Sequence, residues 1–123
     1  MSFILLIIIY AMVSAAGLTL LKTSFTETSL HWSSLTSLLH DVAPLMRNFK
    51  FIIGIVLYLG GFVLWLRILI ERPLSYAFPI ASGALYVAII FAVYLFIGET
   101  ISYVRLIGIA LILSGIILVG RTL

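Results

Sequence analysis

The residues of this chain best suited to chemistry are hydroxyl and basic side chains in or beside long apolar runs. Ser14 lies in the first run, and Ser82 and Tyr86 lie in the third, whereas Lys22 and Arg67 stand near the ends of the first and second runs. A guanidinium presents a fork of donors that matches phosphate oxygens, and an ammonium attracts the same group as a point charge. Uncharged hydroxyls can line a groove for a sugar, or instead bond a carbonyl one turn back in their own helix. The set indicates binding of a polar, anionic group.

The carboxylates of the chain all fall in connections or at the ends of the apolar runs. They are Glu27, Asp41, Glu71 and Glu99. Because a charge at the bilayer centre is costly, an acid retained there would have indicated a functional site. An exporter that exchanges a cation for protons needs such a desolvated acid. The pattern therefore disfavours proton-for-cation exchange.

The histidines and the cysteine content do not favour an enzyme. His31 and His40 lie in the connection after the first run, without a nucleophile or a constellation of carboxylates, and the chain contains no cysteine. We predict no catalytic residue, no metal and no cofactor. The net charge of +3 is spread over ends and short connections, so no nucleic-acid partner is expected.

The composition indicates that lipid is the solvent of most of the chain. Hydrophobic residues make up 64% of the 123 residues and charged residues 9%, whereas soluble domains have roughly 25% charged residues. At about 1.5 Å per residue the first apolar run covers about 28 Å, close to the thickness of a hydrocarbon core. We predict a single-domain, all-α, multi-pass membrane protein with both termini on one side. Its spans are expected at about residues 3–21, 49–70, 74–97 and 101–119.

The connection between the first two runs differs from the others. Apolar residues recur at helical spacing among serines and threonines, namely Leu35, Leu38, Leu39 and Val42. This pattern predicts an amphipathic helix in the membrane interface over about residues 29–43. Trp32 would anchor this helix, and Pro44 would end it. The segment is either an ordinary connector or a lid over an opening toward lipid.

A tight hairpin and a proline mark the third run. Glu71, Arg72 and Pro73 separate it from the second run, and Pro79 lies inside it. A proline leaves one carbonyl without its helical donor, which is tolerated where the backbone faces protein or a polar cavity. We expect this helix to form a wall of a binding site. Arg67 either pairs with Glu71 one turn away or meets a phosphate at the membrane surface.

The fourth run contains a face of small residues. Gly108 and Gly115 are seven residues apart and share a helix face, with Ala110 and Ser114 close by. Small residues let helix backbones approach in lipid. This face is expected to form a dimer interface; the alternative is packing within one chain.

Several of these elements together resemble the small multidrug resistance proteins and the related drug/metabolite transporter superfamily. The chain looks most similar to the small subunits of the flippase for aminoarabinose linked to undecaprenyl phosphate. The resemblance covers nearly the whole chain and is carried by Ser14, Gly17 and Lys22, by Leu64, Trp65 and Leu66, by Pro73, Pro79 and Ser82, and by Gly108 and Gly115.

The sequence departs from the multidrug members at their functional positions. Those proteins have a membrane-embedded glutamate where this chain has Ser14, a tyrosine where it has Phe78, and a tryptophan where it has Ala81. Their proton-for-cation exchange therefore does not transfer to this chain.

The resemblance implies a small-multidrug-resistance-like fold that acts as a dimer in the prokaryotic cytoplasmic membrane. It implies a flippase that moves a polyprenyl-phosphate-linked sugar by alternating access, as a homodimer or with a similar small subunit. Ligand contacts would come from Ser14, Lys22, Arg67, Phe78, Pro79, Ser82 and Tyr86.

Two other functions remain open from the sequence. One is export of small amphipathic cations, held by the rings of Phe78 and Tyr86 through cation–π contacts. The other is an accessory membrane subunit that only packs against a larger complex.

Overall fold

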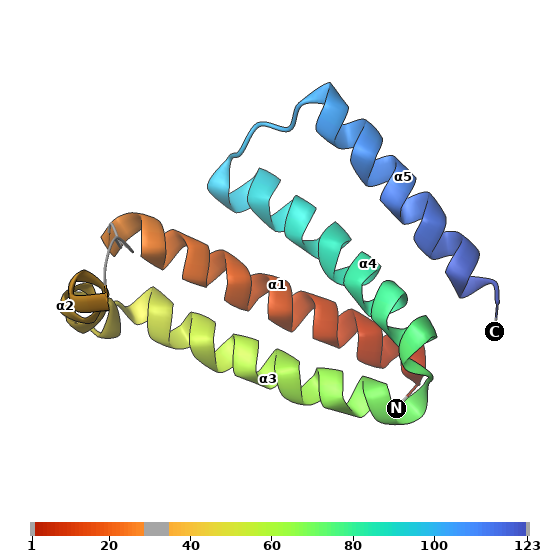
Figure 1. Ribbon diagram of the computed structural model, residues 1–123, viewed down its shortest axis with the longest axis horizontal. Coiled ribbons are helices and arrows are strands. Elements are labelled where there is room, and N and C mark those ends of the chain that lie inside the picture. Colours follow the sequence, from red (N-terminus) through yellow and green to blue (C-terminus); the bar gives the residue numbers. More distant parts are fainter. Residues whose placement is uncertain (1, 29–34, 123) are drawn as a thin grey trace.

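The computed structural model describes residues 2–28 and 35–122, and all of their regular structure is helical (Figure 1). Four of the helices are long and apolar enough to cross a membrane, which confirms the predicted all-α fold with four spans. The elements are α1 (Phe3–Thr28), α2 (Leu35–Met46), α3 (Phe49–Glu71), α4 (Leu74–Ala92), the π-helical turn η1 (Val93–Ile97) and α5 (Tyr103–Gly120).

The four long helices alternate in direction along the chain, so that both described ends lie at one end of the bundle (Figure 1). We call this the terminal end, and we call the opposite end, where α2 lies, the α2 end. The arrangement agrees with the expectation that both termini lie on one side of the membrane.

Helix α1 is the centre of the bundle. Within the described residues it packs against both α3 and α4, whereas α5 contacts only α4. Glycines let α1 and α3 approach closely: a Cβ on Gly17 would stand 2.9 Å from the backbone nitrogen of Tyr58, and one on Gly54 would stand 3.1 Å from the carbonyl oxygen of Gly17. Small residues therefore set this crossing, as expected for helices that associate in lipid.

The buried core lies toward the terminal end. Leu6 and Ile7 of α1 pack there with Ile68 of α3 and with Ala77 and Ala81 of α4. The two alanines are fully or almost fully buried, so α4 lies close to α1 at this level. The core thus ties three of the four long helices together near one end.

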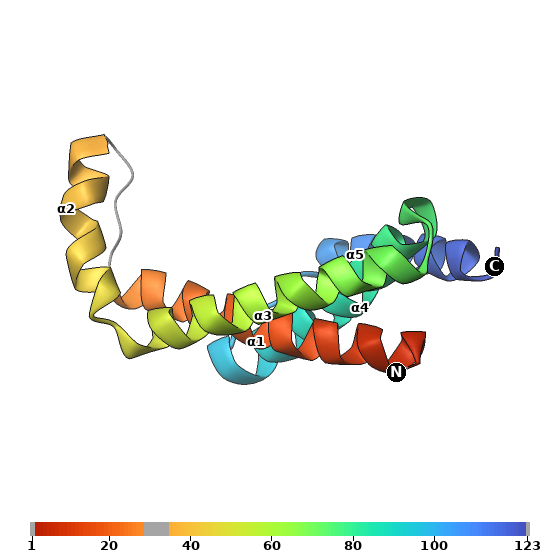
Figure 2. The same cartoon turned by 90° about the horizontal axis from the view of Figure 1, so that it is seen from below.

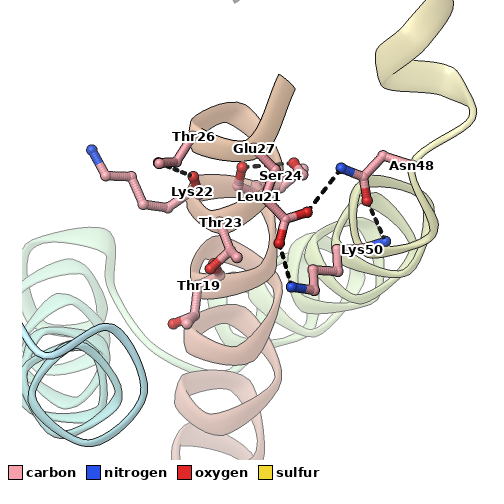
Figure 3. A network of polar contacts seen from close by, with 9 residues as sticks. All are labelled: Thr19, Leu21, Lys22, Thr23, Ser24, Thr26, Glu27, Asn48 and Lys50. Carbon is pink, nitrogen blue, oxygen red and sulfur yellow. Dashed lines mark hydrogen bonds and ion pairs between the residues drawn. The ribbon is translucent and has the colours of Figure 1, made fainter. Parts of the chain in front are cut away.

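Helix α1 is longer than the sequence analysis expected. It runs to Thr28 instead of ending near residue 21, because the polar residues after the apolar run extend it. The Thr23 hydroxyl donates to the Thr19 carbonyl at 2.9 Å and the Thr26 hydroxyl to the Lys22 carbonyl at 3.0 Å (Figure 3). Hydroxyls satisfied by their own helix allow it to continue beyond the hydrocarbon.

An ion pair joins the end of α1 to the start of α3. The Lys50 ammonium lies 2.5 Å from Glu27 Oε1, and the Asn48 amide donates to Glu27 Oε2 at 3.3 Å (Figure 3). The Asn48 side chain also caps α3 by accepting from the Lys50 backbone N–H at 2.9 Å. Two helices separated by the connection are thereby held side by side at the α2 end.

Helix α2 corrects one expectation about the connection. Pro44 does not end the helix, which continues to Met46; the chain then turns through hydrogen bonds from Arg47 and Asn48 to the carbonyls of Pro44 and Leu45. A proline removes one helical hydrogen bond, and near a helix end that loss is small enough for the last turn to persist.

Helix α2 crosses the ends of α1 and α3 at a steep angle (Figure 2), and the side chains of Leu35, Leu39 and Met46 are exposed. Its location in the membrane interface stays a prediction. Trp32 and the first part of the expected segment lie outside the described residues.

Candidate functional site

A cavity of about 370 Å³ lies among α1, α3 and α4, and we call it the aromatic cavity. Its lining combines two serine hydroxyls, several aromatic rings, two of which carry phenolic hydroxyls, and one leucine; among the described residues no carboxylate and no basic group lines it. Three residues that the sequence analysis selected for ligand contacts, Ser14, Phe78 and Ser82, come together here from two helices. The other lining residues are Tyr10, Tyr58, Phe62, Trp65 and Leu85.

The depth and exposure of Ser14 suit a site inside the membrane. Ser14 lies 11 residues after Phe3, about 17 Å along α1 and so near the middle of a hydrocarbon core of about 30 Å. The residue is only 3% exposed. Gly61 of α3 makes room for it, since a Cβ on Gly61 would stand 2.2 Å from the Ser14 hydroxyl oxygen.

The serine hydroxyls of the cavity are not used by their own helices. Thr19 and Ser114 donate to carbonyls one turn back, whereas no such bond is present for Ser14 or Ser82 in the ranges 2–28 and 35–122. A hydroxyl can donate one hydrogen bond and accept others. The two serines therefore offer hydrogen-bonding capacity to whatever occupies the cavity.

The rings of the cavity form one continuous wall across three helices. The ring centres of Tyr10 and Trp65 are 5.9 Å apart, and those of Trp65 and Phe78 are 5.8 Å apart in an edge-to-face arrangement. Aromatic pairs of this geometry hold each other in place. Such a wall presents flat apolar faces to a ligand, beside the two serine hydroxyls.

The remaining rings of this wall were missed from the sequence, although their spacing carried a signal. Tyr58, Phe62 and Trp65 recur at four and three residues, which puts them on one face of α3. Tyr10 stands four residues before Ser14 on α1 in the same way. Aromatic residues at helical spacing beside a polar residue would have pointed to the cavity.

Pro79 lies inside α4, which runs unbroken from Leu74 to Ala92. It follows Phe78 directly and is partly buried. Gly83, one turn later, receives Ile116 of α5: a Cβ there would stand 2.8 Å from the Ile116 side chain. Gly83 therefore has a packing role between α4 and α5, in addition to any bending that it permits.

The basic residues selected from the sequence lie away from the aromatic cavity. The Arg67 guanidinium pairs with the Glu71 carboxylate in the same helix at 3.2 Å, and its side chain is 57% exposed. This is the pairing alternative that the sequence left open. Lys22 stands at the α2 end and points away from Glu27 and Asn48 (Figure 3).

Tyr86 lines a different cavity, of about 330 Å³, between α4 and α5. Ser82 lines both this space and the aromatic cavity. Glu99 and Arg105 also border it. The structure thus divides the expected ligand residues of α4 between two faces of that helix.

The glycines proposed for the dimer interface are not used in packing within the chain. A Cβ on Gly108 or on Gly115 would meet nothing within 4 Å in the described part of the chain. The Ser114 hydroxyl donates to the Ala110 carbonyl at 2.7 Å, so it is already satisfied. The glycine face of α5 is therefore open.

Comparison with protein-family models, with curated proteins and with solved structures finds no match to this chain. What is established is a multi-pass, four-span helical membrane protein with an aromatic, hydroxyl-bearing cavity among three of its spans.

Proposed function

We propose that the protein is one subunit of a dimeric membrane transporter that moves a lipid-linked sugar, carried on a phosphate, between the two leaflets. The observation that carries this proposal is the aromatic cavity. It includes Ser14, near the middle of the first span, and offers rings together with the hydroxyls of two serines and two tyrosines, and no carboxylate of the described residues lines it. A sugar has apolar C–H faces that suit rings and hydroxyls that suit Ser14 and Ser82.

In the proposed mechanism the sugar passes through the cavity while the lipid tail stays in the bilayer. The phosphate would meet basic groups at the two membrane surfaces, Arg67 toward the terminal end and Lys22 toward the α2 end. Arg67 keeps donors free for this role, because a guanidinium has five N–H groups. The third span, with Pro79, would change shape as access alternates.

A second chain would complete the path. Helix α5 contacts only α4 within the described residues, and its glycine face is open. Transport sites commonly lie between repeats or subunits. Pairing through α5 of two identical chains, or of this chain with a similar small subunit, would enclose a path that one chain leaves open.

The test is reconstitution of the protein in vesicles with a polyprenyl-phosphate sugar whose exposure on each leaflet is followed by a membrane-impermeant reagent. We expect Phe78→Ala and the Ser14→Ala/Ser82→Ala double variant to slow exchange between leaflets at least tenfold. Phe49→Ala is the matched control, because Phe49 is 74% exposed and lies outside the cavity. Unchanged exchange in an Arg67→Ala/Lys22→Ala variant would remove the phosphate roles of those residues.

A second candidate function, export of small amphipathic cations, is favoured by the ring wall itself. Trp65 and Phe78 present π-faces of the kind that bind quaternary ammonium groups. Proton-coupled uptake of a quaternary ammonium compound into the same vesicles, lost in Phe78→Ala, would establish this function in place of the first. Activity that appears only with a partner chain would instead indicate an accessory subunit.

A further inference from the structure

A second, larger space lies on the other side of α1 from the aromatic cavity. It has a volume of about 600 Å³ and is bounded by α1 between Met12 and Thr23 and by α4 and η1 between Ala88 and Phe96. None of its lining residues lines the aromatic cavity. We call it the α1–α4 groove. Its volume is within the range of roughly 300–1,000 Å³ typical of ligand sites.

Small side chains keep the α1–α4 groove open. Ala15 and Ala16 of α1 face it together with Ala88 and Ala92 of α4. Near the terminal end, α1 and α4 are held together by the buried core of Leu6, Ile7, Ala77 and Ala81. The two helices then diverge toward the α2 end (Figure 1), and the alanines leave that space unfilled.

The polarity of the groove is concentrated at one end. Thr19 and Thr23 line it, but their hydroxyls already donate to carbonyls of α1 at 2.7 and 2.9 Å. Among the described residues, Lys50 is the one charged residue of its lining. An ammonium has three donors, and Glu27 takes one of them. An apolar channel therefore ends at a cation with donors to spare.

The length and the volume of the groove fit a lipid chain. From Met12 to Thr23 the groove follows α1 for about 17 Å, roughly half of a 30 Å hydrocarbon core, or one leaflet. A hydrocarbon chain is thin enough to enter.

We propose that the α1–α4 groove binds an anionic membrane lipid, with an acyl chain between α1 and α4 and the phosphate on Lys50. A phosphatidylglycerol of the leaflet at the α2 end has the required chemistry. Lys22 adds a second ammonium on α1 near this end, so the cations outnumber Glu27 there. The site stands whether or not the aromatic cavity transports a sugar.

The direct test is labelling of the reconstituted protein by a phosphatidylglycerol that carries a diazirine in its acyl chain, in phosphatidylcholine vesicles. Mass spectrometry of the peptides should place adducts in residues 12–23 and 88–96. The phosphatidylglycerol should label these residues about fivefold more than a phosphatidylcholine with the same diazirine does. This ratio is the effect of one basic group near an anionic surface. Equal labelling by the two lipids would overturn the proposal.

Groove-filling variants test where the acyl chain of the lipid binds. Ala92→Phe and the milder Ala16→Leu should each reduce these adducts at least fivefold, whereas Ala110→Phe, on the exposed face of α5, should leave them unchanged. Circular dichroism and gel filtration check that each variant is folded. If Ala92→Phe does not fold, the milder Ala16→Leu provides the test. Labelling that persists in a folded groove-filling variant would overturn the proposal.

The Lys50–Glu27 ion pair provides a test of the head-group contact. The test distinguishes binding of the lipid head group from a purely structural role of the pair. Lys50→Gln should abolish the preference for phosphatidylglycerol and Lys50→Arg should keep it, whereas Glu27→Gln should keep or raise it by freeing the ammonium. If the pair were only structural, breaking it from either side would have the same effect, and that result would overturn the proposal.

The chain has no cysteine, so a single Ala16→Cys variant also reports whether a second copy covers the groove. A disulfide between two copies through this residue would overturn lipid occupancy.

Discussion

At the scale of single residues, two cations near the terminal end, Arg67 and Arg72, already have partners, and these contacts define what each side chain is free to do. Arg67 pairs with Glu71 in α3. The Arg72 guanidinium lies 5.0 Å from the ring centre of Phe3 and 5.9 Å from that of Tyr76, a cation–π arrangement that holds the hairpin between α3 and α4 against the start of α1. Neither contact consumes all donors of its guanidinium.

The Arg67–Glu71 pair allows a structural role to be separated from a role in transport. Both Arg67→Ala and Glu71→Gln should change the free energy of unfolding by less than about 0.5 kcal/mol, because an exposed pair at i, i+4 contributes little. Titration with sodium dodecyl sulfate in mixed micelles measures this. In the proposed function only Arg67→Ala slows transport, since Glu71→Gln keeps the guanidinium. Equal slowing in both variants would assign the effect to the ion pair.

At the scale of elements, helix packing depends on glycines, which have no side chain to keep two helices apart. α1 and α3 approach at Gly17, Gly54 and Gly61, and the same approach directs Ser14 into the aromatic cavity. One set of glycines therefore both holds the helix pair together and positions a residue of the candidate site.

A double-mutant cycle tests this coupling. Gly61→Ala should destabilise the protein by about 1–3 kcal/mol, as overpacking does, because its Cβ would collide with the Ser14 hydroxyl. In a Ser14→Ala background the cost should fall by at least about 0.5 kcal/mol, the size expected for residues in contact. Gly60→Ala is the control, since its Cβ would meet only Val13, at 4.0 Å. Additive effects measured by unfolding in mixed micelles would contradict the contact.

The turn after η1 gives a prediction that depends on backbone alone. Gly98 has φ of 75°, and a Cβ there would meet nothing within 4 Å. Gly98→Ala should therefore cost about 1–2 kcal/mol, the penalty of the left-handed region for other residues. Gly98→Val should cost more and Gly98→Asn less, because asparagine tolerates this region. The measurement is the order of the unfolding midpoints of these three variants. Equal midpoints would exclude a backbone cause.

At the scale of the whole molecule, the bundle is uneven. Three spans share a core near the terminal end, whereas α5 is attached through α4 alone, with Ile109 as its buried hydrophobic residue in the described part of the chain. A helix with so little burial within its chain has most of its surface available to lipid or to a second subunit.

The proposed dimer predicts different effects for two similar substitutions on α5. Gly108→Leu or Gly115→Leu should weaken self-association at least tenfold, about 1.4 kcal/mol, because bulk on a small-residue face prevents close approach. Ala110→Leu is the matched control. The sequence analysis placed Ala110 close to the glycines, but a residue two positions after Gly108 is turned by about 200° from it and therefore faces away from that glycine. Light scattering in detergent or cross-linking in vesicles gives the measurement. Equal association of all three variants would exclude this face.

Several residues of the candidate site could be predicted from the sequence, but which of them line the same cavity could not. Ser14, Phe78 and Ser82 were selected from the sequence, and they line one cavity. Tyr86 was selected with them and lines another, and Arg67 lies outside both. The rotation of each helix about its axis decides such groupings, and that rotation depends on contacts between helices that are distant in sequence.

The sequence by itself determined the four spans, their alternation and the placement of both termini on one side, because hydropathy and run length are local properties of the chain. Only the tertiary structure decided that α1 is the central helix, that Gly54 and Gly61 form its contact with α3, and that α1 and α4 diverge to leave a groove. The physical reason is that lipid solvates every apolar face almost equally. Hydrophobicity therefore marks which segments enter the membrane, and side-chain shape decides which of their faces meet.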